Sequence, residues 1–396
     1  MPAGPGISNT KSESIMAGAA KIDITPQNSV FIGGYGQDRR STGVHDPVWA
    51  RSLVLDIGGR RIAFVSLDLV GLFLEDVTKI RNRASSEHLR ANDIIVSCTH
   101  NHQGPDTLGL WGPSMGESGV DPSYQSSVVR DAAESVSQAE AELADSRARI
   151  AETRVEGVSK NARDKDVLDP TMIAMKFEST DCENIATLIN FPNHPEALGS
   201  ENTLISSDWP HYLYRKLEDT LGGICVYQNG ALGGMVTPNV TSHEFSEVRR
   251  VGNMTAQAAI DVLSSASFMK IPRVAHAAAD LRLPLDNDNF LKLRELGVIR
   301  RGFISEKVRT EIHYMRLGDL EILTIPGEAL PKVGMGLKSL MDSPYRMLIG
   351  LGNDELGYII PEEDFDRSKY EESMSVGPRT APLMAEKARI LVEAGV

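Results

Sequence analysis

The feature that most constrains this chain is the stretch 94–106, I-I-V-S-C-T-H-N-H-Q-G-P-D, where an apolar run passes directly into a polar loop containing Gly and Pro. The run predicts a short buried strand with the loop at its carboxyl end. In open α/β sheets, ligands bind at that end of the strands. His100 and His102 are two residues apart, so extended backbone would place both imidazoles on one side, about 7 Å apart at the backbone. They could share a metal ion or a substrate, although an H-x-H pair alone is more often a pair of hydrogen-bonded loop residues.

The negative net charge argues against nucleic acid and anionic membranes as the main binding partner. The 396 residues carry a formal net charge of -13, which would repel nucleic acid and an anionic membrane surface, so we expect a small-molecule substrate. The segment 1–18 lacks the features of a secretory signal and predicts a disordered leader. No apolar run approaches the ~18 residues of a spanning helix. Cys98, Cys182 and Cys225 lie in or beside apolar runs and predict buried free thiols, so we expect a cytoplasmic protein.

Hydrophobic periodicity predicts a mixed α/β fold. Strands are expected at 19–26, 50–57, 61–67, 94–96, 155–163, 172–177, 186–191, 224–227, 273–283, 310–317, 320–325 and 346–351. Helices are expected at 74–89, 125–144, 205–221 with a cap at Ser207 or Asp208, 244–265, 291–301 and 331–341. The order of elements indicates α/β (mixed α+β) architecture with central mixed β-sheets flanked by helices and a site at the strand ends. We expect one domain over 19–396, with room for a small C-terminal subregion from about residue 270.

Two further strands deliver polar side chains into turns. The sequence F-P-N-H-P-E after 186–191 carries His194, and P-G-E after 320–325 carries Glu328. Imidazole and carboxylate are ligand types that zinc accepts. The Gly-rich stretch 228–239 lacks the G-K-[ST] ending of a nucleotide-phosphate loop. Its backbone N–H groups could instead line a pocket for an oxyanion.

Together these motifs resemble the neutral/alkaline (non-lysosomal) ceramidase family, zinc-dependent amidases that cleave the N-acyl bond of ceramide. The family's T-H-T-H-S-G-P is similar to residues 99–105, and its second histidine block to N-H-P at 193–195 with I-S-S-D at 205–208. The P-G-E stands at 326–328. The family's two tyrosines, twelve positions apart, are matched by Tyr358 and Tyr370. As in the family, an acidic residue and then Gly-Pro follow the second tyrosine. The resemblance runs in the same order from about residue 19 to 378.

The resemblance implies a site for Zn²⁺ and roles for the residues around it. It implies metal ligands at His100, His194, Glu328 and Tyr358. It implies that His102, Arg163 and Tyr370 act on the developing oxyanion or the leaving amine, with Thr237 where the family has its catalytic serine. Substrate binding is expected at Gly234 and at Trp111 of the irregular loop 108–123.

Departures from the family keep several interpretations open. Thr237 is β-branched and stiffer than serine, so we expect it to position the substrate. Asn101 and Gln103 replace the family's Thr and Ser. The resemblance covers the catalytic domain only, without the additional C-terminal β domain that serves lipid presentation, which weakens the assignment of ceramide as the substrate. The sequence therefore predicts a zinc-dependent hydrolase of an N-acyl amide, small-molecule or lipid. A zinc esterase or lactonase, a small N-acyl amidase and a non-catalytic zinc-binding scaffold are alternatives, and the oligomeric state is open.

Overall fold

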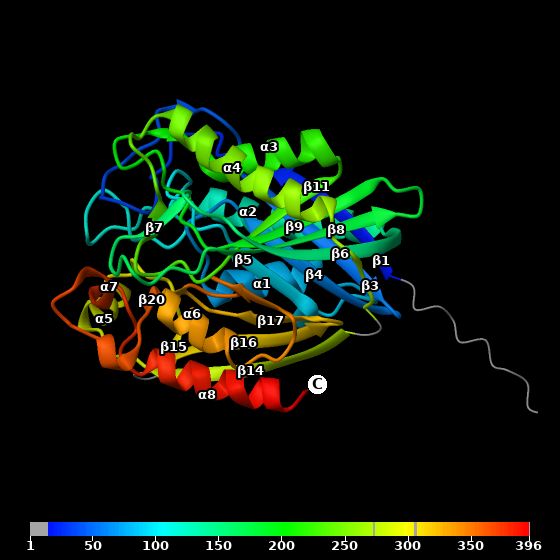
Figure 1. The fold of residues 1–396 in the computed structure, drawn as a ribbon. Helices are drawn as coiled ribbons and strands as arrows, with labels where there is room; N and C mark the ends of the chain where they lie inside the picture. Colours follow the sequence, from blue (N-terminus) through cyan, green and yellow to red (C-terminus); the bar gives the residue numbers. More distant parts are fainter. Residues whose placement is uncertain (1–14, 272–273, 305–306, 396) are drawn as a thin grey trace, which may run out of the picture.

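The computed structural model describes residues 15–271, 274–304 and 307–395, and arranges them in four layers. Helices cover a nine-stranded sheet, the other face of that sheet packs on a five-stranded sheet, and further helices cover the second sheet (Figure 1). The predicted fold class, mixed sheets flanked by helices, is therefore confirmed.

The nine-stranded sheet forms the centre of the molecule. Its hydrogen-bonded path runs β11-β9-β8-β6-β1-β3-β4-β5, and β13 pairs with β6. Its strands are β1 (Ile15–Asp23), β3 (Trp49–Ile57), β4 (Arg60–Leu67), β5 (Ile94–Cys98), β6 (Ala144–Arg154), β8 (Thr171–Ser179), β9 (Asn184–Phe191), β11 (Ile224–Asn229) and β13 (Phe268–Met269). Among the described strands of this sheet, β4 with β5 and β9 with β11 are the parallel neighbours, and a helix connects the strands of each pair. Parallel neighbours require such a crossover.

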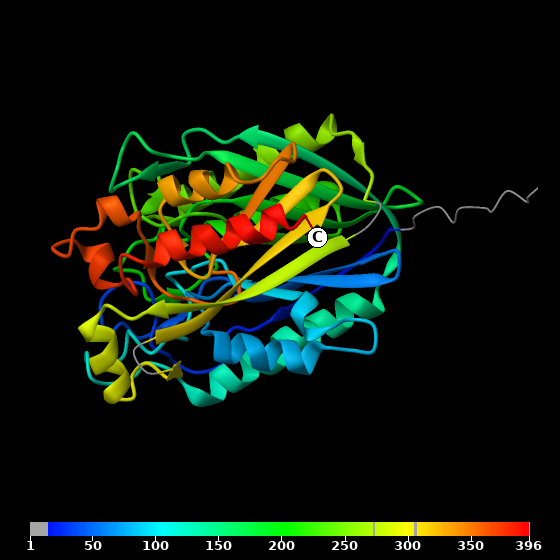
Figure 2. The ribbon, with the colours of Figure 1, turned by 90° about the horizontal axis from the view of Figure 1, so that it is seen from below.

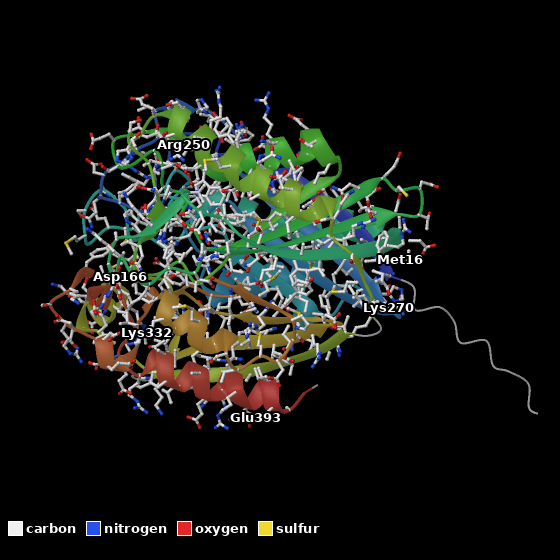
Figure 3. All side chains as sticks on the ribbon, in the orientation of Figure 1. Met16, Asp166, Arg250, Lys270, Lys332 and Glu393 are labelled. Carbon is white, nitrogen blue, oxygen red and sulfur yellow. The ribbon has the colours of Figure 1, made fainter. Side chains whose placement is uncertain are left out.

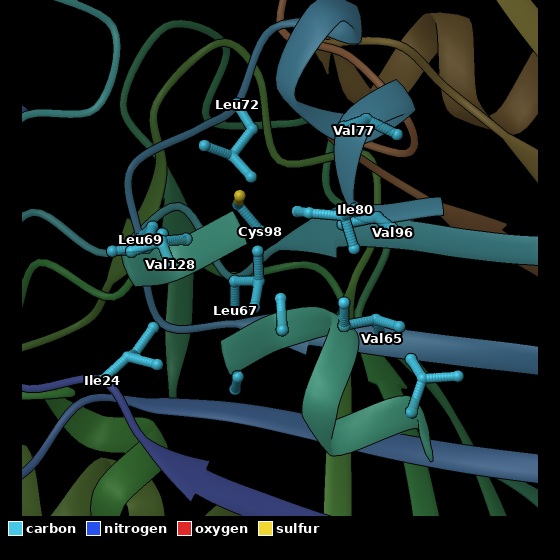
Figure 4. Packing of buried hydrophobic residues seen from close by; sticks show 14 of the residues in the cluster. Ile24, Val65, Leu67, Leu69, Leu72, Val77, Ile80, Val96, Cys98 and Val128 are labelled. Carbon is cyan, nitrogen blue, oxygen red and sulfur yellow. The ribbon is translucent and has the colours of Figure 1, made fainter. Parts of the chain in front are cut away.

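Four helices cover the outer face of this sheet: α1 (Leu74–Ala84), α2 (Pro122–Ala141), α3 (Trp209–Leu221) and α4 (Phe245–Ser264). Along β3 the side chains alternate, since Val54 packs toward the helices while Leu53 and Leu55 pack toward the second sheet. This is the period of two that a pleated strand imposes. Figure 4 shows how side chains from β4, β5 and the helices interdigitate, with Val77 and Ile80 of α1 among them.

The second sheet has the order β14-β16-β17-β19, with β15 paired to β16. Its strands are β14 (Val274–Pro284), β15 (Phe303–Ile304), β16 (Lys307–Leu317), β17 (Leu320–Thr324) and β19 (Tyr345–Ile349). One face shares a core with the nine-stranded sheet through residues such as Met315 and Ile322. Helices α6 (Pro331–Lys338) and α8 (Thr380–Glu393) lie over the other face, and Figure 2 shows α8 crossing the strands.

The nine-stranded sheet curves, so that strands from the two ends of its path meet. The Ser66 hydroxyl of β4 donates to the backbone oxygen of Tyr227 in β11, and Ser97 of β5 donates to Gln228. The short elements gather mainly at one end of the molecule (Figure 1). They are β2 (Gly43–Val44), β7 (Ser159–Asn161), β10 (Leu204–Ile205), β12 (Val236–Pro238), β18 (Glu328–Ala329), β20 (Tyr358–Ile359), α5 (Asp288–Glu295), α7 (Tyr370–Ser373), η1 (Ala91–Asp93) and η2 (Glu362–Asp364).

Most predicted elements are present, and the errors have local causes. The strands predicted at 50–57 and 61–67 form the antiparallel pair β3 and β4, and the predicted cap of α3 by Asp208 is confirmed. The predicted leader extends too far, because β1 begins at Ile15 and pairs with β3; residues 1–14 lie outside the described residues. The strand predicted at 155–163 is present only as the three residues of β7, Ser159–Asn161, and the long strand before it was missed. Strand β6 ends at Arg154, and its polar, partly exposed sequence concealed it next to the end of α2. Helix α8 was not predicted.

The surface carries the charged side chains, such as Asp166, Arg250, Lys332 and Glu393 (Figure 3). The cysteines are free, as predicted, but only Cys98 and Cys225 are buried; Cys182 is exposed because it lies in the turn between β8 and β9. In the described part of the chain, no helix is both long and apolar enough to cross a membrane.

Candidate active site

His100 lies just beyond β5, held with one ring nitrogen facing the protein backbone. Its Nδ1 is 2.6 Å from the carbonyl oxygen of Val70, so Nδ1 donates to that oxygen and Nε2 is the nitrogen left to face the site. The residue has a φ of 66°, an unfavourable conformation for a non-glycine residue that is typically retained at functional sites. Asn101 next to it donates to the backbone oxygens of Asp68 and Ser206, which fixes the loop.

His194 follows β9 and has the same orientation with respect to the backbone. Its Nδ1 lies 2.8 Å from the Val236 carbonyl oxygen, and its own carbonyl accepts the indole N–H of Trp209 at 2.9 Å. The side chain is fully buried. A backbone acceptor on one imidazole nitrogen is the arrangement by which proteins orient a metal-binding histidine.

Glu328 is the point at which these two histidines converge. Its Oε2 lies 3.3 Å from Nε2 of His100 and 3.3 Å from Nε2 of His194. Burial would raise the pKa of Glu328, but the two histidines hold it well below its usual range. Strand β18 carries Glu328 and pairs in parallel with β20, where Tyr358 is its register partner. The Tyr358 side chain is buried, and its hydroxyl donates to the sulfur of Met235 at 3.4 Å.

His102 lies beside this pair and is buried. Its ring centroid is 4.9 Å from that of His100 and 5.5 Å from that of His194. Nδ1 lies 3.2 Å from Oε2 of Glu196, but neither ring nitrogen makes an aligned hydrogen bond to any described residue. Burial lowers the pKa of His102 to about 4, although Glu196 opposes the shift, so the ring is neutral near pH 7. Gly34 makes room for the ring, because a Cβ there would lie 2.3 Å from it.

These residues fit a metal ion. The three histidines each offer a ligand nitrogen, and these atoms lie within 4.8 Å of one another. A carboxylate oxygen lies against two of the nitrogens, and both of those rings are oriented by backbone carbonyls. Two or three neutral imidazoles with one carboxylate form a donor set that suits zinc or a related divalent ion.

The remaining residues from the sequence prediction lie around this centre in different ways. Tyr370 places its ring centroid 6.1 Å from that of Tyr358 and is 59% exposed. Arg163 is ion-paired to Glu371 at 3.0 Å and to Glu372 at 2.6 Å. Its role toward an oxyanion stays a prediction.

Thr237 and Gly234 belong to the Gly-rich segment beside His194. Thr237 lies in β12, paired with β7, and its side chain helps to lower the pKa of Glu196, which burial alone would raise. Gly234 has a φ of 71°, and its carbonyl oxygen accepts the backbone N–H of Arg163 at 3.2 Å. Both positions therefore support the site's walls, and direct substrate contact by either stays a prediction.

A pocket opens onto the histidines and is mostly apolar. His100, His102, Glu328, Tyr358 and Tyr370 line it on one side. Its other walls include Phe73, Leu110, Trp111, Phe290, Leu356 and Val376. Trp111 thus lies where the sequence predicts substrate contact, and Arg163, Thr237 and Gly234 do not line this pocket.

Two functional candidates were missed by sequence reasoning. Glu196 stands in the quoted N-H-P-E motif, yet only the fold brings its carboxylate to His102 and leaves its Oε1 without a partner among the described residues. Asp208 accepts the backbone N–H groups of Ala197 and Leu198 at 3.0 Å each, which fixes the segment after His194. The signal for Asp208 was its place in I-S-S-D, which was assigned to the family's second histidine block and to a helix cap but given no role in the site.

Comparison with known proteins agrees with this site. The sequence pattern described as "Neutral/alkaline non-lysosomal ceramidase, N-terminal" matches residues 15–241, which is more than half of the chain. The chain belongs to the neutral/alkaline non-lysosomal ceramidase family. The matched region carries all three histidines of the cluster, whereas Glu328, Tyr358 and Tyr370 lie beyond it.

Individual ceramidases are similar at lower identity. The neutral ceramidase of Pseudomonas aeruginosa is 23% identical over 271 residues, a match that covers 59% of this chain and 40% of the relative. The crystal structure of neutral ceramidase from Pseudomonas aeruginosa superimposes with a TM-score of 0.81 at 19% identity, over 97% of this chain and 75% of that one. A ceramidase complexed with C2 gives 0.79 at 18% identity, over 96% of this chain and 74% of that one. These structures share the fold.

Proposed function

We propose that this protein is a zinc-dependent hydrolase that cleaves the amide bond of an N-acyl substrate. The observation that carries the proposal is the convergence of Nε2 of His100 and Nε2 of His194 on one oxygen of Glu328, beside an apolar pocket. Membership of the ceramidase family supports an amide as the scissile bond. The apolar walls suit the acyl chain of a lipid or a smaller N-acyl compound.

His100, His194 and Glu328 would hold the metal, with Tyr358 as the fourth ligand. When bound, zinc supplies Lewis acidity that polarises a carbonyl and acidifies a coordinated water. The Nδ1 contacts to the carbonyls of Val70 and Val236 keep both Nε2 lone pairs available for it. Glu328 is ionised in this environment, so it contributes the negative charge that a divalent ion requires.

The chain's other residues handle protons and orientation. His102 is neutral, and its ring nitrogens have no aligned hydrogen-bond partner among the described residues, so it can accept a proton and return it to the leaving amine. Glu196 lies against Nδ1 of His102 and would stabilise the imidazolium formed. Arg163 ties Glu371 and Glu372 of α7 to the strand ends, which places Tyr370 at the pocket mouth, where its hydroxyl could donate to an oxyanion.

The test is hydrolysis by the zinc-loaded protein of a substrate panel: ceramides of several acyl lengths, simple N-acyl amides, and matched esters and lactones. Released acid is measured by mass spectrometry, before and after chelation and zinc return. Amide cleavage that chelation abolishes and zinc restores supports the proposal. Cleavage of esters or lactones alone would assign the other bond class. Stoichiometric zinc without turnover of any acyl substrate would indicate a scaffold instead.

The exposed His88 provides the matched control, because His88→Ala leaves the pocket untouched. The comparison variant is His102→Gln, which removes the proton-accepting ring and leaves the proposed metal ligands His100, His194 and Glu328 in place. We expect it to lower turnover by about 100-fold or more while zinc content is unchanged. Equal turnover in both variants would remove His102 from the chemistry.

A further inference from the structure

The apolar pocket contains two buried polar side chains that the proposed chemistry does not use. Arg301 and Glu355 both line it, at 6% and 5% exposure. Each has one polar atom without a hydrogen-bond partner among the described residues: Nε of Arg301 and Oε2 of Glu355. A buried donor or acceptor left unpaired costs about 1–3 kcal/mol, so two such atoms in one pocket require an explanation.

The rest of the Arg301 guanidinium is fully engaged. Its two terminal nitrogens donate to both oxygens of Asp354, and one also reaches the carbonyl of Arg309 at 2.8 Å. Asp354 further accepts from the Thr310 hydroxyl at 2.7 Å and from the backbone N–H of Leu74 at 3.0 Å. The guanidinium is therefore held rigidly, and Nε–H is the donor that remains.

Glu355 is held by its other oxygen. Oε1 accepts the backbone N–H of Gly357 at 2.7 Å. Gly71 makes room for the side chain, because a Cβ at that position would lie 2.9 Å from Cγ of Glu355. Burial raises the pKa of Glu355 well above its usual range, and the charge of Glu328 adds to this. Oε2 is the oxygen of this side chain that has no partner among the described residues.

We infer that Arg301 and Glu355 form a polar subsite inside the acyl pocket, which selects acyl chains that carry an oxygen substituent such as a hydroxyl or keto group. An oxygen of either kind accepts from Nε–H of Arg301, and a hydroxyl also donates to Oε2 of Glu355. A plain alkyl chain would leave both atoms unpaired, and sites built to bond a polar group discriminate strongly against ligands that lack it. The inference rests on the proposed function, since it concerns the acyl part of the same substrate.

Binding without turnover tests the subsite. Calorimetry would compare an N-methyl alkanamide with a series of N-methyl amides of equal chain length that bear one hydroxyl at successive carbons. We expect at least one hydroxylated ligand to bind the wild type about tenfold more tightly than its parent, the value of one additional hydrogen bond. In Glu355→Leu this preference should disappear, while His88→Ala, a change at an exposed residue outside the pocket, should retain it.

Each outcome bears on the inference separately from hydrolysis. Preference for the unsubstituted amide in the wild type, or a hydroxyl preference unchanged in Glu355→Leu, would overturn it even if the enzyme cleaves amides. Absence of binding by every ligand would overturn it as well, because the pocket would then not be an acyl site. If Glu355→Leu does not fold, Glu355→Met supplies the apolar variant, and Glu355→Gln should preserve part of the preference through its amide.

Discussion

Two buried histidine clusters among the described residues differ in how many of their ring nitrogens have hydrogen-bond partners. At the strand ends, His100 and His194 each use one ring nitrogen for a backbone carbonyl and direct the other toward Glu328, while His102 has no aligned partner. Between the two sheets, His276 and His313 use every nitrogen. Nδ1 of His276 lies 2.6 Å from Asp93, its Nε2 lies 2.9 Å from Nδ1 of His313, and Nε2 of His313 lies 2.8 Å from Glu311.

This difference distinguishes the candidate metal site from the His276–His313 network, which connects the two sheets and has a structural role. The His276–His313 chain connects β14 and β16 of the second sheet to Asp93, just before β5 of the first, and Arg81 of α1 completes it by pairing with Glu311. A network with every nitrogen partnered stabilises the packing of two sheets and has no capacity left for a ligand. Ring nitrogens that converge on one carboxylate oxygen mark a candidate binding site, whereas burial alone does not.

The largest effect should come from breaking the strand-end cluster. His194→Ala removes a nitrogen that faces Glu328, so zinc affinity should fall by more than about 100-fold and hydrolysis with it. Elemental analysis after dialysis, with competition against a chelator, measures this. His88→Ala is the control and should keep about one zinc per chain. Zinc retained in His194→Ala would mean that the ligand set is wrong.

Disrupting the His276–His313 network should lower the stability of the protein and leave metal binding unchanged. His313→Ala leaves Glu311 and one nitrogen of His276 without this hydrogen-bond partner, so we expect the free energy of unfolding to fall by about 3 kcal/mol. Urea unfolding of the zinc-loaded proteins gives the value, and their zinc content should equal that of the wild type. A variant that unfolds like the wild type but loses zinc would reverse the roles assigned to the two clusters.

Tyr358→Phe sharpens the definition of the strand-end cluster. The variant keeps the buried ring and removes only the hydroxyl, whose one hydrogen bond within the described part of the chain is a long one to the Met235 sulfur. If the phenol oxygen is a ligand, zinc affinity should fall about tenfold while stoichiometry stays the same. Tyr212→Phe, in α3, is the matched control. Identical affinities for wild type and Tyr358→Phe would restrict the ligands to imidazole and carboxylate.

The smallest effect concerns the pH dependence of stability. Burial lowers the pKa of His313 from 6.5 to about 4, although Glu311 opposes the shift. The unfolded chain therefore binds this proton more readily, so the contribution of His313 is complete above pH 6.5 and is lost as the pH falls toward 4, by up to about 1 kcal/mol per pH unit. Unfolding free energies at a series of pH values should show a shallower slope for His313→Gln. Parallel slopes would contradict the shift.

Local patterns were sufficient to predict the strand-end positions. His100, His194 and Glu328 each follow an apolar run that forms the predicted strand, because a buried strand must end where its polar turn begins. The fold class followed from the same periodicity. The prediction of β6 failed, since its alternation is masked by arginine and glutamate side chains on a partly exposed strand.

The sequence by itself determined which side chains leave the strands at polar turns and the family to which the chain belongs. Only the tertiary structure decided that Val70 and Val236 orient the two imidazoles, that Glu196 lies against His102, and that Arg163 is bound to the acids of α7. The reason is physical. Strand and turn formation depend on neighbours in the chain, whereas a hydrogen-bond partner or a buried charge is set by contacts between segments far apart in sequence.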